Sequence, residues 1–248
     1  MHKFDEKVMS SDETRASSRR TPCPQLGQWH LPPGFGEQLL AQHVPAIYEK
    51  GSVLFVRGSP SDIFFFLFEG VVCLYATQPD GTQSTFMLAG PGDFVGFANA
   101  NDGSGAIHCL DARALTKCSV GLFTRRHLFQ SLSNQSASVL LGLIEAMTAG
   151  WSRALLWQLN FLRLSFRDRI ELVLRELGAK FGVTNDRGIM IDLNLRHSEL
   201  SEMVGCSRQL VGKLLGQLAS GGAIETAQDG RLILMEPLLT EAAECCTV

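Results

Sequence analysis

Residues 195–218 constrain the fold more than any other segment, because their small and apolar positions suit two short helices that meet at a sharp turn. Leu200 and Val204 lie four residues apart on the first helix. Gly205 follows where the turn needs a left-handed backbone. The apolar face of the second helix comprises Val211, Leu214 and Leu215. This spacing predicts a helix-turn-helix.

Serines mark the ends and the crossing of these two helices. Ser198 and Ser207 are the predicted N-caps, and Ser201 is small where the helices approach closely. The exposed start of the second helix then presents side chains that bond base edges and phosphates, as a helix entering the major groove requires. The predicted DNA contacts are Ser207, Arg208, Gln209 and Lys213.

A short hairpin is predicted directly after the second helix. Gly221 and Gly222 end that helix, and the sequence AIETAQDGRLILME contains two apolar runs joined by a turn at Asp229-Gly230. The motif is therefore a winged helix-turn-helix. We expect Arg231 on the hairpin to reach a DNA phosphate.

Composition is that of a soluble globular protein, with 45% hydrophobic and 19% charged residues in 248. No apolar run reaches the roughly 18 residues of a membrane span, and the first twenty residues mix both charge signs, so we expect a cytoplasmic protein. The net charge of −3 is unusual for a DNA-binding protein, but residues 206–220 contain two cations and no acid.

Seven cysteines are scattered without paired CxxC spacing, which predicts reduced thiols, and no metal site is expected. The adjacent Cys245 and Cys246 fit an incidental pair in a C-terminal tail, residues 237–248. The chain has no phosphate-cradling loop and no nucleophile-base set, so we predict that it is not an enzyme.

Short apolar runs between residues 44 and 123 alternate with glycine-rich turns, which predicts an effector-sensing β-roll over residues 31–127, after a disordered tail at 1–30. A long dimerisation helix is predicted over 128–165, and the winged domain over 166–236. The fold class is therefore α+β. The predicted dimer seam follows heptad steps along Leu140, Ile144, Met147, Trp151, Ala154, Gln158 and Phe161.

This order of elements resembles the cyclic-AMP receptor protein and fumarate-nitrate reduction regulator family of bacterial transcription factors. The resemblance covers about residues 33–236 and is carried by YEKGSVLFVRGSPSDIFFFLFEGVVCLY, LAGPGDFVGF and VGCSRQLVGKLL. It implies a homodimer, a small-molecule or redox signal sensed in the roll, a twofold-symmetric DNA site, and RNA polymerase as a partner.

The chain departs from the cyclic-AMP binders of that family where they hold the nucleotide. Their Gly-Glu pair is here Gly96-Phe97, and their Arg-Ser pair is His108-Cys109. A buried phosphate would lose its charged partner, so we expect no ordinary cyclic-AMP binding. Arg113 or Arg153 could serve a different anion. The predicted effector pocket comprises Phe97, His108, Cys109, Ser152 and Arg153.

Two redox branches of the family fit less well. Cys23 and Cys118 are too few thiolates for a four-cysteine iron-sulfur cluster. A haem sensor would use His108-Cys109 and the prolines near residues 21–24, yet adjacent strand residues point to opposite faces. The sequence therefore identifies no cofactor and no particular effector.

Two readings of the function stay open besides a haem-based gas sensor. The first is a homodimeric DNA-binding regulator whose roll senses a ligand. The second is a cyclic-nucleotide-type regulatory module that acts through protein partners, although such a module has no need of Arg208, Gln209 and Lys213 on a capped helix.

Overall fold

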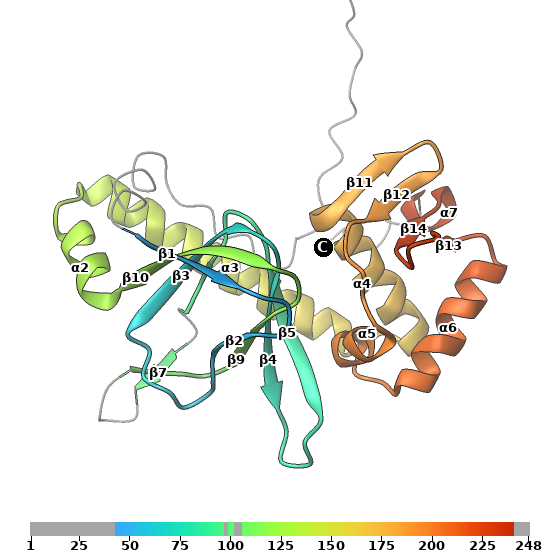
Figure 1. Cartoon of the computed structure of the whole chain (residues 1–248), viewed down its shortest axis with the longest axis horizontal. Helices are drawn as coiled ribbons and strands as arrows, with labels where there is room; N and C mark the ends of the chain where they lie inside the picture. Colours follow the sequence, from blue (N-terminus) through green and yellow to red (C-terminus); the bar gives the residue numbers. More distant parts are fainter. Residues whose placement is uncertain (1–42, 97–98, 102–105, 241–248) are drawn as a thin grey trace, which may run out of the picture.

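The N-terminal domain is a β-roll built from two four-stranded sheets, with strand orders β1-β10-β3-β6 and β2-β9-β4-β5, and a small β7-β8 pair (Figure 1). The computed structural model describes residues 43–96, 99–101 and 106–240. The strands are β1 (Val44–Tyr48), β2 (Val53–Phe55), β3 (Ile63–Glu69), β4 (Val72–Thr77), β5 (Gln83–Ala89), β6 (Phe94–Val95), β7 (Asn99–Asn101), β8 (Ala106–His108), β9 (Asp111–Ala114) and β10 (Cys118–Thr124).

The core of the roll forms because β3 and β10 are apolar on both faces. Leu67 and Val120 are fully buried between the two sheets, whereas Phe64 and Phe123 pack on the other side against the following helix. Gly70 allows the tight turn from β3 to β4: its φ is +88°, and a Cβ there would lie 2.3 Å from the Lys117 carbonyl oxygen. The predicted β-roll is confirmed.

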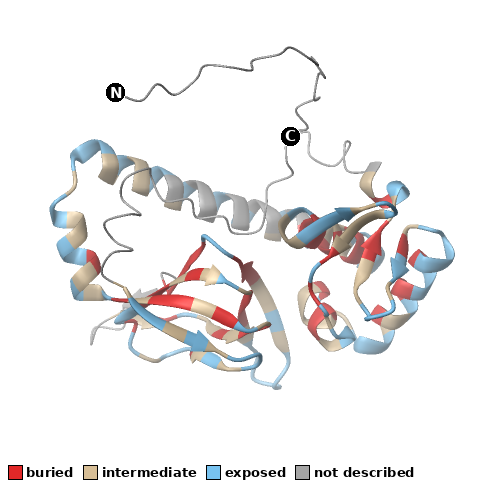
Figure 2. Cartoon of the chain, turned by 45° about the horizontal axis from the view of Figure 1, so that its top comes forward, coloured by how far each residue is buried: buried red, intermediate tan, exposed pale blue. Residues whose placement is uncertain are grey.

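The predicted dimerisation helix over 128–165 is two helices in the structure, α2 (Arg125–Ser133) and α3 (Ala137–Phe161). The break falls in a polar stretch, where the Ser136 hydroxyl accepts a hydrogen bond from the Val139 amide. The hydroxyl takes the place of a backbone carbonyl as the acceptor, so a new helix starts here. Helix α3 runs from one end of the roll to the second domain (Figure 2).

The second domain joins helices to a four-stranded sheet of order β11-β12-β14-β13. The Ser165 hydroxyl caps its first helix by accepting from the Asp168 amide. Its elements are α4 (Phe166–Phe181), β11 (Gly182–Asn185), β12 (Gly188–Ile191), α5 (His197–Val204), α6 (Arg208–Ser220), β13 (Ile224–Thr226), β14 (Leu232–Leu234) and α7 (Glu236–Thr240).

Two features of this domain were not predicted. The hairpin β11-β12 adds two strands to the sheet that carries the wing, with Ile189 paired to Leu234. Helix α7 occupies the start of the segment predicted as a tail at 237–248. The remaining tail, including Cys245 and Cys246, and the predicted disordered residues 1–30 lie outside the described residues.

The two domains contact each other through β5 of the roll and helices α4 and α5. Lys180 of α4 and Asp93 of the roll form an ion pair at 2.7 Å in which both side chains are almost fully buried. Arg113 of β9 pairs with Glu202 of α5. These contacts fix where the second domain sits on the roll.

Candidate functional site

The turn between α5 and α6 has the predicted geometry. Gly205 adopts a left-handed backbone with φ 74° and ψ 35°, and its amide donates to the Ser201 carbonyl at 2.9 Å. One predicted cap is wrong: α5 begins after Arg196, not at Ser198. The Arg196 amide donates to the Glu199 carboxylate at 2.7 Å, and this pairing takes the place of a serine cap.

The apolar faces of both helices meet in the domain core as predicted. Leu200, Val204 and Val211 are fully buried, and Leu214 and Leu215 are nearly so. This packing leaves the opposite side of α6 to solvent, because a helix that buries one stripe exposes the rest. The fold therefore orients the first turn of α6 outward.

The predicted DNA contacts gather at the amino-terminal end of α6. Ser207 is the N-cap, and its hydroxyl accepts from the Leu210 amide at 3.2 Å. Arg208, Gln209 and Lys213 are exposed, and neither cation forms an ion pair with any described residue. These side chains are free to meet base edges or phosphates.

The wing is present, but its arginine is already paired. Strands β13 and β14 form the predicted hairpin, with Ile224 opposite Leu234. The Arg231 guanidinium bonds Asp229 at 2.7 Å and Asp192 at 2.5 Å. Both carboxylates compete with a phosphate for this side chain, so its predicted phosphate contact requires an exchange of partners.

His108 is the predicted effector residue that the structure places inside the roll. The residue is 3% exposed, its ring stacks on Phe55 with ring centroids 3.9 Å apart, and its Nδ1 has no hydrogen-bond partner among the described residues. Burial lowers the pKa of His108, as does the nearby positive charge of Arg125, while Asp62 opposes the shift. The imidazole is therefore kept neutral and has an open acceptor or donor site.

The other predicted pocket residues do not join His108. Cys109 and Ser152 are exposed, so the His108-Cys109 pair does not face one pocket. Phe97 and the Arg153 side chain lie outside the part of the chain that is described. Arg113, considered for an anion, instead bonds Gln83 and Glu202 and lies over the Tyr75 ring.

The cysteines and histidines show no arrangement for a metal. Within residues 43–96, 99–101 and 106–240, His, Cys, Asp and Glu form no group of three or more that could hold an ion. Cys118 is buried, and burial raises the pKa of its thiol, which favours the protonated form over a ligating thiolate. Cys23 and the neighbouring prolines lie outside the described residues. In the described chain, none of the helices has the length and hydropathy needed to span a bilayer.

The ion pairs between the domains were missed at the sequence level. A signal existed for Lys180, which stands three residues after Leu177 and seven after Val173 on the apolar stripe of α4. A lysine on such a stripe indicates that an acidic side chain is buried beside it. Its partner Asp93 lies at the start of the apolar run DFVGF, and nothing in that pattern indicates a buried ion pair.

Two family models match this chain. A cyclic nucleotide-binding domain matches residues 46–135, and a Crp-like helix-turn-helix domain matches residues 168–239. Together they cover well over half of the sequence. The two matched ranges coincide with the roll and the winged domain described above.

Curated relatives and solved structures agree with these matches. The chain is 24% identical over 204 residues to a CRP-like cAMP-activated global transcriptional regulator of Mycobacterium tuberculosis, covering 79% of this chain and 86% of the relative. It is 27% identical over 180 residues to the global nitrogen regulator of Synechocystis, with 71% and 78% covered. The structure of FixK2 from Bradyrhizobium japonicum has the same fold, with a TM-score of 0.71 at 20% identity over 83% of this chain and 99% of that one.

Proposed function

Because this chain belongs to the cyclic-AMP receptor protein and fumarate-nitrate reduction regulator family, we propose that it is a homodimeric transcription regulator controlled by a small molecule held in its roll. It binds a twofold-symmetric DNA site through α6 and works with RNA polymerase in the cytoplasm. The observation that carries this proposal is the capped, solvent-facing first turn of α6, with its unpaired cations.

The chemistry of α6 suits base readout. The planar fork of Arg208 can bond two acceptors of guanine, and the Gln209 amide suits adenine. Lys213, one turn later, suits guanine or a phosphate. The cyclic-AMP receptor pattern has glutamate where Gln209 stands, so the preferred half-site of this protein differs at that contacted base pair.

Competition binding on a site selected from random DNA tests the proposal. Arg208→Ala is expected to cost about 1–3 kcal/mol on the selected palindrome and less on random DNA, whereas Lys213→Ala weakens both alike if it holds only a phosphate. Arg126→Ala, which removes the same charge from α2 in the roll, is the control. Equal losses on both DNAs for Arg208→Ala would reassign it to positioning, and a folded wild type that selects no DNA would favour the regulatory module with protein partners.

The dimer is supported by α3, which exposes apolar side chains that water disfavours. Of the predicted seam residues, Ile144 is exposed and available to a partner, whereas Phe161 is buried against α4 of its own chain. The exposed apolar side chains along and just after α3 are Leu141, Ile144, Leu155, Leu159 and Leu162. Leu141, Leu155 and Leu162 are separated by multiples of seven residues, which suits pairing with a second helix.

The effector is expected near His108 and is not cyclic AMP. A neutral, buried imidazole stands where the cyclic-AMP binders present an arginine, so the cyclic phosphate would lack its charged partner. Isothermal calorimetry with cyclic AMP should show no binding at micromolar concentrations. A micromolar affinity would contradict this part of the proposal.

A further inference from the structure

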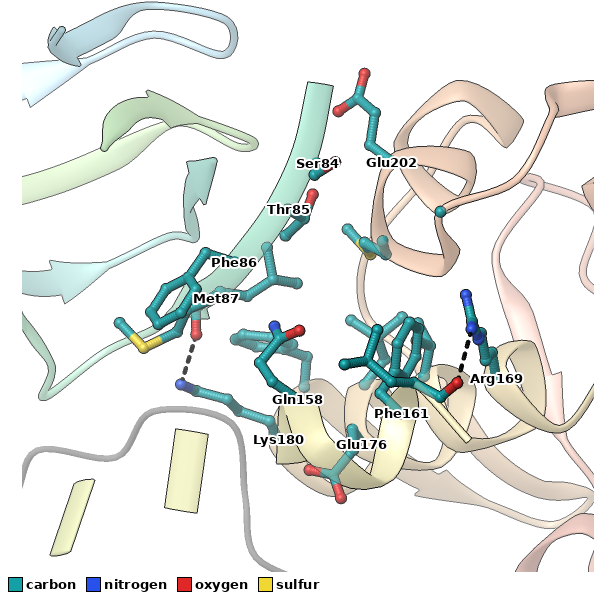
Figure 3. A pocket seen from close by; sticks show the side chains of 17 residues that line it. Ser84, Thr85, Phe86, Met87, Gln158, Phe161, Arg169, Glu176, Lys180 and Glu202 are labelled. Atoms are coloured by element: carbon teal, nitrogen blue, oxygen red, sulfur yellow. Dashed lines mark hydrogen bonds between the residues drawn. The ribbon is translucent and has the colours of Figure 1, made fainter. Parts of the chain in front are cut away.

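A cavity of about 190 Å³ lies between the roll and the winged domain (Figure 3). One wall is β5, with Thr85 and Leu88, and the facing wall is formed by the end of α3 and by α4, with Phe161 and Leu177. Met203 of α5 lines it from a third side. We propose that this cavity binds a small neutral molecule about the size of one aromatic ring.

The size of the cavity limits its ligand. An engineered apolar cavity of about 150 Å³ binds benzene, so this volume accommodates one ring with a small substituent. A cyclic nucleotide, with a bicyclic base, a ribose and a phosphate, would not fit inside this volume and would have to extend into solvent. The walls are mainly apolar side chains, and the Thr85 hydroxyl and the Gln158 amide are polar groups that could orient a ligand.

The charged groups at the walls select against a charged ligand, because each already has partners. The Lys180 ammonium bonds Asp93 at 2.7 Å and the Leu88 carbonyl at 2.8 Å, and Glu176 interacts with its charge. Glu202 pairs with Arg113. The Arg169 guanidinium donates to the Leu164 carbonyl at 3.1 Å and lies over the rings of Phe161 and Phe166. A cation entering the cavity would therefore lose water without gaining a free carboxylate, and an anion would have to draw Arg169 away from its carbonyl and ring contacts.

The position of the cavity gives its occupancy a consequence for α6. A ligand that touches β5 and α5 together binds only while the two domains are packed as in this structure, so it shifts the population toward this arrangement. Gly205, the turn residue three positions before the first residue of α6, is itself part of the lining. This regulatory step rests on the proposed DNA-binding function, but the ligand site itself does not.

The test uses methionine methyl groups and benzyl alcohol as the probe. Full-length protein labelled with ¹³C at its seven methionine methyls is titrated, and resonances are assigned by Met→Leu variants. Met203 lines the cavity from the winged domain, and its methyl is expected to shift saturably. The Met87 side chain packs in the core of the roll, so its methyl is expected to stay in place together with those of Met1, Met9, Met147, Met190 and Met235. Absence of a saturable shift at Met203 would overturn the proposal.

Variants that fill the cavity show whether the methionine shift arises from binding inside it. Thr85→Trp and Leu177→Trp should each abolish the shift at Met203, so the cavity is filled once from the roll and once from the winged domain. Thr184→Trp, a tryptophan placed on the exposed strand β11, should leave that shift intact. Because the two filling variants alter different domains, misfolding of one leaves the other informative. Persistent shifts in a folded filling variant would refute the site.

The coupling to domain packing is tested separately. Arg113→Gln removes an ion pair between the domains without altering a residue of the cavity wall, and it should weaken benzyl alcohol binding several-fold. Unchanged affinity would overturn the coupling. DNA selection by the unliganded protein keeps the two proposals apart: DNA binding without methionine shifts would sink only the cavity, and methionine shifts without DNA binding would sink only the regulator.

Discussion

The buried pair of Lys180 and Asp93 should stabilise the packing of the two domains, and its removal is open to measurement. The two side chains are 7% and 3% exposed; the ammonium also donates to the Leu88 carbonyl, and the carboxylate accepts from the Gly90 amide 2.8 Å away. Lys180→Met would leave a buried carboxylate without its counter-charge. Breaking a buried pair in this way costs about 3–5 kcal/mol.

Part of that loss can be relieved if the domains separate and water reaches Asp93. The cost then appears as a larger radius of gyration in small-angle X-ray scattering, in place of a lower midpoint in urea unfolding. We therefore expect Lys180→Met to change at least one of the two measurements. Burial lowers the pKa of Lys180 despite the opposing effect of Asp93, which agrees with a costly desolvation of the ammonium.

A double-mutant cycle identifies the pair itself. Lys180→Met and Asp93→Asn together should cost less than the sum of the single changes, with a coupling of about 0.5–3 kcal/mol. The control is Lys117→Met, because Lys117 pairs with Glu49 on the surface with side chains 65% and 71% exposed, and such pairs contribute about 0–1 kcal/mol. Additive losses and an unchanged radius of gyration would refute the buried pair.

Three further predictions follow from single positions. Burial lowers the pKa of His108 below its usual value near 6.5, so the unfolded chain binds the proton first as the pH falls. The free energy of unfolding should therefore decrease as the pH drops below about 6.5. Urea titrations of His108→Phe should lack that part of the decrease. Leu155→Lys should halve the mass that light scattering reports, from about twice 27.1 kDa to one chain, and a monomeric wild type would contradict the dimer. Gly205→Ala should cost about 1–2 kcal/mol in unfolding free energy from its left-handed backbone alone, because the nearest atom to the new Cβ is 3.8 Å away; no change would show that the turn relaxes.

The sequence predicted those parts of the fold whose signals are local. Apolar runs and glycine turns located the strands of the roll, and the Gly205 turn with its flanking apolar residues located α5 and α6. The Ser198 cap failed because Glu199 can reach back to the Arg196 amide, so two candidate starts compete within three residues. The hairpin β11-β12 was not predicted because its strands, GVTN and GIMI, do not alternate between apolar and polar side chains. The hairpin is held in place by the pairing of β12 with β14.

Of the candidate site, only the exposed start of α6 could be predicted from the sequence. Exposed residues at a helix start follow from the apolar periodicity, so the exposure of Arg208, Gln209 and Lys213 was predicted, and their contact with DNA stays a prediction. The surroundings of His108 and the contact of Lys180 with Asp93 depend on residues far apart in sequence. A hydropathy pattern states that a position is buried, but it does not state which other buried groups surround it.

The overall charge of −3 is compatible with DNA binding because of where the acids lie. In the winged domain, Glu199 is buried at the start of α5 and Glu202 is held by Arg113 of the roll. Asp192 and Asp229 share Arg231, and Glu225 pairs with Arg187. These acids are thus buried or held by neighbouring cations, while Arg208 and Lys213 of α6 form no ion pair with any described residue. Two such cations neutralise few phosphates, so we expect the affinity for DNA to depend on base contacts more than on counterion release.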